Sequence, residues 1–62
     1  MFSEYDPVKI KFSGIRGIIV DIANIRGEII YTIEGDAKIP AEDGNGETWP
    51  LYQCKENEIE KA

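Results

Sequence analysis

With 62 residues the chain has room for one domain, and a domain of this size buries only roughly 60% of the surface that its unfolded form exposes. A single cysteine, Cys54, excludes an internal disulfide, and the absence of histidine removes the commonest zinc ligand, so the hydrophobic core alone must stabilise the fold. The net charge of −5 comes from 12 acidic and 7 basic side chains, and the whole excess lies from Glu34 onward. This balance disfavours a polyanionic partner such as nucleic acid.

The segment from Met1 to Asp6 is acidic where a signal peptide would be basic, and no apolar run approaches the roughly 18 residues of a membrane-spanning helix. A lone thiol without an export signal fits a reducing compartment. We therefore expect a soluble, cytoplasmic protein without a membrane segment, and a flexible N-terminus over residues 1–6.

The first predicted strand covers residues 8–12, where apolar side chains alternate with lysines in the period of two that marks a strand with one buried face. Val8, Ile10 and Phe12 form that face. The two glycines in residues 13–17 then favour a short connection, because glycine adopts positive φ angles that other residues resist.

Two further strands, over residues 18–23 and 28–34, are predicted on either side of a tight turn at residues 24–27. Both are rich in β-branched residues and too short for typical helices. The side chains expected to share one face are Ile18, Val20 and Ile22 in the first and Ile29, Tyr31 and Ile33 in the second.

Residues 35–48 contain glycines, a proline and several acids without sustained periodicity, so we expect a long, mobile, acidic loop with a short pairing around Ile39. Strand character resumes over residues 49–54, where Pro50 indicates an edge position or a strand start. A single helical turn is expected over residues 55–58, and a last short strand beside the first over residues 59–61.

Five short strands with glycine turns and no long helix predict an all-β fold, with residues 1–62 forming a single small barrel or sandwich domain.

The run from Asp6 to Ile22 resembles the KOW motif of SH3-like barrels, in which a strand of alternating valine and lysine is followed by a glycine-containing loop and a second strand. The remainder is similar in layout to small SH3-like proteins of bacteria and phages. The resemblance implies a five-stranded SH3-like barrel with the acidic loop between strands three and four. It also implies binding to RNA, to ribosomal components or to other proteins, although barrels of this shape serve many unrelated functions.

An aromatic cluster of Tyr31, Trp49 and Tyr52 is the first candidate site, because amphipathic rings offer both apolar area and a polar handle to a partner. The alternative is that the rings complete a small core, which we favour for Tyr31. Trp49, beside the acidic loop, is the strongest single candidate for a contact with another protein or assembly.

A second candidate site consists of basic side chains that would contact the phosphates of a nucleic acid: Lys9, Lys11, Arg16 and Arg26. The alternative, favoured by the net charge, is that they lie on solvated strand faces and discourage edge-to-edge pairing.

No catalytic constellation, cofactor or metal site is predicted. The oxygen ligands of residues 43–47 resemble the start of a calcium loop, but Thr48 and Cys54 occupy positions that need glycine and glutamate. No histidine is available to activate the Cys54 thiol. The leading hypothesis is a non-enzymatic module that docks another protein or assembly, as a monomer or a weak homodimer, and a KOW-like nucleic-acid or ribosome-associated domain is the alternative.

Overall fold

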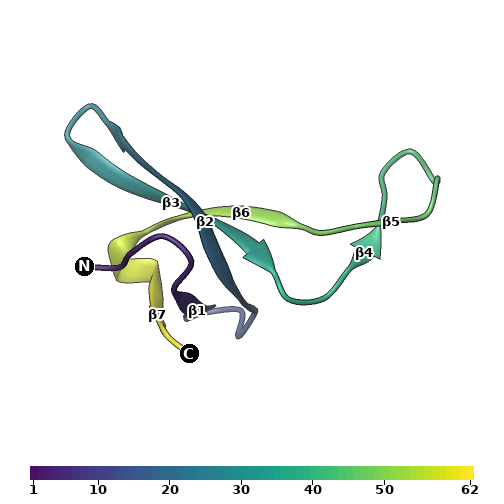
Figure 1. Ribbon diagram of the computed structural model, residues 1–62, viewed down its shortest axis with the longest axis horizontal. Coiled ribbons are helices and arrows are strands. Elements are labelled where there is room, and N and C mark those ends of the chain that lie inside the picture. Colours follow the sequence, from purple (N-terminus) through teal and green to yellow (C-terminus); the bar gives the residue numbers. More distant parts are fainter.

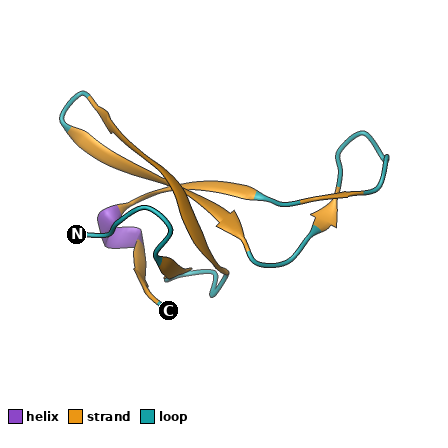
Figure 2. Ribbon diagram, viewed as in Figure 1, coloured by secondary structure: helices purple, strands orange, loops and turns teal.

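Seven strands and one short 3-10 helix make up the regular structure of the computed structural model, which describes residues 1–62 (Figures 1 and 2). Five strands form an antiparallel sheet in the order β6-β3-β2-β1-β7, and the other two form a separate hairpin. The chain is therefore all-β. The elements are β1 (Pro7–Ile10), β2 (Arg16–Ile25), β3 (Glu28–Gly35), β4 (Ile39–Pro40), β5 (Glu47–Thr48), β6 (Leu51–Lys55), η1 (Glu56–Glu58) and β7 (Ile59–Lys61).

The first strand ends two residues earlier than its alternation predicts. Val8 and Ile10 are buried as expected, but the Phe12 side chain is 85% exposed. The chain turns immediately after Ile10, whose carbonyl accepts a hydrogen bond from the Gly14 N–H at 2.8 Å, and Gly14 has a φ of 76°. The prediction that Phe12 is buried is wrong because this turn lifts it out of the strand.

A β-bulge interrupts the pairing of β2 with β3. Ile19 pairs with Ile33, but the next pair is Asp21 with Thr32, so Val20 is an additional residue without a partner on β3. Such an insertion bends the strand and increases its twist.

The bulge also changes which side chains of β2 face the core. Directly opposed residues of an antiparallel pair lie on the same face of the sheet. Ile19 is buried before the bulge, whereas Ile22 stands opposite the buried Tyr31 after it. The prediction that Ile18, Val20 and Ile22 share one face is wrong, because one inserted residue reverses the alternation.

The tight turn between β2 and β3 is confirmed. Ile25 pairs with Glu28, which leaves Arg26 and Gly27 as a two-residue loop with φ angles of 55° and 83°. Two successive positive φ angles are typical of the type I′ turn that matches the twist of a hairpin. The Gly27 N–H donates to the side-chain oxygen of Asn24 at 3.0 Å.

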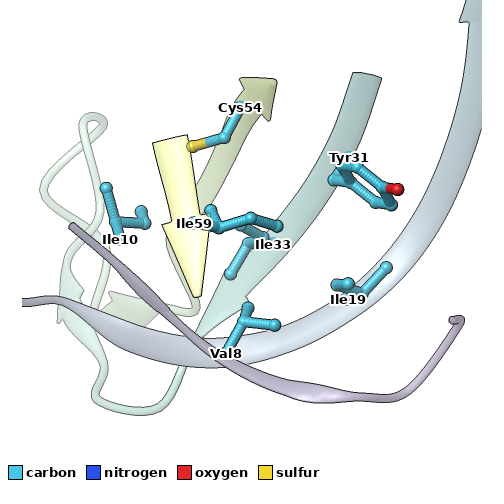
Figure 3. Close-up of a cluster of buried hydrophobic side chains, with 7 residues drawn as sticks. All are labelled: Val8, Ile10, Ile19, Tyr31, Ile33, Cys54 and Ile59. Atoms are coloured by element: carbon cyan, nitrogen blue, oxygen red, sulfur yellow. The ribbon is translucent and has the colours of Figure 1, made fainter. Parts of the chain in front are cut away.

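The core is a single cluster to which all five strands of the sheet contribute (Figure 3). Its buried residues are Val8, Ile10, Ile19, Tyr31, Ile33, Cys54 and Ile59. Four partly buried side chains pack against this cluster, namely Phe2, Ile15, Ile29 and Tyr52. The last strand pairs with the first, as expected, and contributes Ile59 to the interior.

The five-stranded sheet is open but strongly curled. The edge strands β6 and β7 are joined only by the three residues of η1. In a flat sheet four strand spacings would separate these edges by about 19 Å, whereas three residues of 3-10 helix rise only about 6 Å. The sheet must therefore curl until its edges approach each other at η1. The structure contains no helix that is long and apolar enough to span a membrane, since η1 has only three residues.

Residues 36–48, which we call the arm, project from the body at the right of Figure 1. The short pairing expected around Ile39 is present, since Ile39 pairs with Thr48 and Pro40 with Glu47. Every residue of the arm is exposed except Ala41, which is half-buried. The arm contacts the body at its base, where the Asp36 N–H donates to the Arg16 carbonyl at 3.0 Å. The mobility of residues 35–48 stays a prediction.

Candidate functional site

Three adjoining hollows on one side of the molecule all have Tyr52 among their lining residues. One lies between the β1–β2 connection and the start of the arm, the second between that connection and β6, and the third at the base of the arm. We call their shared apolar surface the Tyr52 groove. Its members are Phe12, Ile15, Ile39, Trp49, Leu51 and Tyr52.

The position of Tyr52 depends on a glycine in the neighbouring strand. Tyr52 pairs with Ile33 of β3, and its ring lies beside Gly35 two residues further along that strand. A Cβ at Gly35 would lie 2.8 Å from Cγ of Pro50 and 3.4 Å from Cε2 of Tyr52. The missing side chain therefore lets Pro50 and the Tyr52 ring approach the backbone of β3, where Tyr52 contacts the core and remains half-exposed.

Trp49 lies where the arm rejoins the body, and its side chain is 45% exposed. The ammonium group of Lys38 is 5.4 Å from the centroid of its ring, within the range of a cation–π interaction. The next residue, Pro50, is buried and fixes the start of β6. Trp49 is thus held at its backbone while part of its indole faces solvent.

The edges of the Tyr52 groove are formed by side chains that would ordinarily be buried. Phe12 and Leu51 are 85% and 62% exposed, and both line the second hollow. Ile39 is also exposed and lines the first and third. Exposed apolar side chains that gather in this way are characteristic of the interaction sites of proteins.

The charged residues of the groove are mostly acidic. Asp36, Glu42 and Glu58 line one hollow each, whereas Arg16 is the only basic residue that lines any of the three. The side chains that line the hollows therefore carry a net negative charge, which the Lys38 ammonium over the Trp49 ring partly offsets.

Tyr31, predicted with Trp49 and Tyr52 as a contact residue, is fully buried. Its ring packs edge-on against Phe2, with centroids 5.6 Å apart. Its hydroxyl accepts a hydrogen bond from the Phe2 N–H at 3.4 Å and donates one to Oε1 of Glu56 at 3.3 Å. Tyr31 thus belongs to the core, as its alternative interpretation holds, and the exposed aromatic surface consists of Trp49 and Tyr52.

The N-terminal segment contacts both Tyr31 and β2. Besides the ring of Phe2, it supplies the Tyr5 N–H, which donates to the Ile19 carbonyl at 2.7 Å, and the Asp6 carbonyl, which accepts from the Ile19 N–H at 3.1 Å. The sequence predicts flexibility for residues 1–6, but Tyr5 and Asp6 form these backbone hydrogen bonds with β2 just before its bulge.

The four basic residues of the second candidate site do not form one patch. Lys9 lies opposite Arg16, but its other neighbour is Glu60, with which it forms an ion pair at 3.3 Å. Arg16 begins β2 and Arg26 follows its end, so the ten-residue strand separates them by about 30 Å. Lys11 lies in the β1–β2 connection. Only Lys9 and Arg16 are brought together, and an acid partly neutralises that pair.

The buried Cys54 also lines the second hollow. Burial raises the pKa of its thiol, and the nearby carboxylate of Glu58 raises it further. At neutral pH the group is therefore a thiol and a weak nucleophile. No group of three or more histidine, cysteine, aspartate or glutamate side chains is arranged to hold a metal ion.

The sequence analysis missed Phe12, Ile15, Ile39 and Leu51 as groove residues. Strand alternation assigned Phe12 to the core, Ile15 lay in a predicted connection, Ile39 in a loop with a short predicted pairing, and Leu51 in a predicted strand. The available signal was an apolar residue inside a glycine-rich or acidic loop, where burial is not expected.

No protein-family model, curated protein or solved structure matches this chain. Its function is therefore inferred from its own geometry.

Proposed function

We propose that the chain is a non-enzymatic interaction module of the SH3-like type that docks another protein through the Tyr52 groove. The observation that carries this proposal is the meeting of three apolar hollows at Tyr52, with Trp49, Leu51 and Phe12 exposed around them. Apolar area in contact with water is unfavourable by about 25 cal/mol per Å². A partner that covers the groove would recover part of that free energy.

The SH3-like assignment is supported by the curled antiparallel sheet of five short strands. It is also supported by the resemblance over residues 6–22, which include β1, the glycine-containing connection and the first part of β2. In this arrangement the sheet is the support, and the β1–β2 connection, the arm and β6 carry the proposed binding surface. Binding residues on connections held by a rigid scaffold are common in proteins.

A protein is favoured over a nucleic acid because acids outnumber bases in the groove, and the net charge of the chain is −5. Tryptophan and tyrosine are also enriched among the residues that dominate protein interfaces. An enzymatic function at the Tyr52 groove is disfavoured because Asp36, Glu58 and Glu42 each line a different hollow, so no two carboxylates line the same hollow of the groove, and the Cys54 thiol is neutral.

The test begins with affinity capture of the partner from the native host, followed by a titration of the purified pair. Trp49→Ala should weaken binding roughly 10- to 30-fold, the effect of removing an interface hot spot of about 2 kcal/mol. Ile25→Ala is the matched control, because Ile25 is an exposed apolar residue at the far tip of the β2–β3 hairpin.

Urea denaturation of both variants establishes that the folded state is retained. If Trp49→Ala and Ile25→Ala bind the partner with the affinity of the unaltered chain, the Tyr52 groove is not the docking surface. If Ile25→Ala alone weakens binding, the contact lies at the tip of the hairpin instead.

A further inference from the structure

The outer edge of β6 has backbone groups without a partner strand. β6 is the last strand of the sheet, and only β3 pairs with it. The Pro50 carbonyl, just before the strand, accepts from the Gly35 N–H at 2.8 Å, whereas the Lys55 N–H turns to Oε1 of Glu58 at 2.7 Å. Because bonding groups alternate along an antiparallel strand, the N–H groups of Leu51 and Gln53 also point away from β3.

Natural sheets usually obstruct such an edge with proline, lysine, a bulge or a covering element. Here Pro50 and Lys55 stand at the two ends of β6, and the residues from Leu51 to Cys54 lie between them. The Leu51 and Gln53 side chains are exposed. The open stretch is long enough to pair with a short extended segment of about four residues.

The second hollow of the Tyr52 groove lies directly beside this edge. Leu51 and Gln53 line it from β6, while Phe12 and Ser13 line it from the β1–β2 connection. A strand added along β6 would direct every second side chain to the same face. Alternate side chains of the added segment would thus enter the hollow and contact Phe12.

We infer that the partner binds as an extended segment that adds to the free edge of β6, with apolar residues alternating with basic ones. This inference rests on the proposed docking function and specifies its mode. In strand addition, main-chain hydrogen bonds supply affinity and the pockets for alternate side chains supply specificity.

The charge of the groove argues for a basic segment of a different protein over a second copy of this chain. Acids line each of the three hollows, with Arg16 as the only base among the lining residues. Two copies would each bring a net charge of −5 to the contact. Juxtaposed like charges oppose association, whereas opposite charges accelerate encounter and select the partner.

The test uses blocked synthetic heptapeptides in which valine, leucine or phenylalanine alternates with lysine, titrated into the isotopically labelled chain and followed by NMR. A matched set carries glutamate in place of lysine. For the lysine peptides we expect amide exchange at Leu51 and Gln53 to slow roughly tenfold or more at saturation. The glutamate peptides should bind roughly tenfold more weakly.

Gln53→Pro removes an N–H that faces away from β3, so the pairing within the sheet is kept while the added strand loses a hydrogen bond. It should weaken the lysine peptides roughly tenfold, and the control Gln53→Ala, which keeps the N–H, should stay within about twofold. If the proline variant unfolds, the complementary hydrogen bonds, in which peptide N–H groups donate to the carbonyls of β6, are removed by N-methylating alternate amides of the peptide in its two possible registers. The unaltered protein should then bind one of the two methylated peptides roughly tenfold more weakly.

Each contrary result identifies which idea fails. Peptides that shift Trp49 and Tyr52 resonances without slowing exchange at Leu51 and Gln53 would overturn strand addition but leave the docking groove intact. Protection of those two amides that grows with the concentration of the free chain would assign the edge to a second copy and overturn the basic partner. If no peptide binds, the inference is rejected, and the effect of Trp49→Ala on the captured partner then decides the proposed function separately.

Discussion

Replacing Gly17 by alanine tests how closely β2 and β3 approach each other. Gly17 pairs with Val8 on one side and with Gly35 on the other. A Cβ at this position would lie 2.3 Å from the carbonyl oxygen of Glu34 and 2.8 Å from Cγ2 of Ile33, whereas ordinary contact begins at 3.4 Å. The nearest obstacle is backbone, so no side-chain rotation can relieve the overlap.

Relief requires the two strands to move apart by roughly 1 Å, which weakens the hydrogen bonds on either side of the contact. The loss of two bonds at about 1 kcal/mol each, added to an overpacking strain of about 1–3 kcal/mol, gives a destabilisation of about 3–5 kcal/mol. A domain of 62 residues has a total stability of roughly 3–9 kcal/mol. We therefore expect Gly17→Ala to be largely unfolded, or to unfold at a urea midpoint at least about 3 M lower for an m-value near 1 kcal/mol/M.

The assay is urea denaturation followed by far-UV circular dichroism, with Gly14→Ala measured in parallel. Gly14 has a positive φ but nothing within 4 Å of an added Cβ, so alanine there should cost only about 1 kcal/mol of backbone strain. A loss of stability at Gly17 no larger than that at Gly14 would refute the close approach of the two strands.

Three further predictions concern the core, the thiol and the basic residues. Tyr31→Phe removes the two long hydrogen bonds of a buried hydroxyl, and it should lower the free energy of unfolding by about 1 kcal/mol in the same urea assay. A loss above about 3 kcal/mol would contradict this small contribution of the hydroxyl. Because burial, and then Glu58, raises the pKa of the Cys54 thiol, the folded state disfavours the thiolate, and stability should fall as the pH rises past about 8.5. Cys54→Ala should show less of this fall between pH 7 and pH 10, and identical pH profiles would exclude the thiol as its source. Fluorescence anisotropy should detect only weak, salt-sensitive binding of single-stranded RNA. Arg26→Ala should leave this binding unchanged, since Arg26 lies about 30 Å from Arg16. Tight binding of RNA at physiological salt would favour the nucleic-acid hypothesis.

Local patterns in the sequence predicted most of the strand framework. The alternation around Val8 and Ile10, the turn at Arg26 and Gly27, and the pairing of the last strand with the first are all present in the structure. The first two depend on neighbours in the chain or on a simple period, because side chains of a strand alternate between two faces and glycine tolerates a positive φ.

The course of β2 was not predictable from its composition. Ile18, Ile19, Val20 and Ile22 are all apolar, so either alternating set is an acceptable core face. The unpaired Val20 leaves Ile19 buried before the bulge and turns Ile22, which is still 37% exposed, to the same face after it, and the bulge is a property of the pairing with β3.

The candidate site likewise has some features that the sequence predicts and others that depend on the tertiary structure. The position of Trp49 beside the acidic loop marked it as a candidate contact residue, and the excess of acids predicted a charged surface, because unpaired charges are almost never buried. The sequence favoured the core for Tyr31, but only the tertiary structure left Tyr52 half-exposed and placed Phe12 and Leu51 on the same hollow. The physical reason is that strand character follows from each residue and its near neighbours, whereas burial and proximity depend on where the sheet curls and which of its edges remains unpaired.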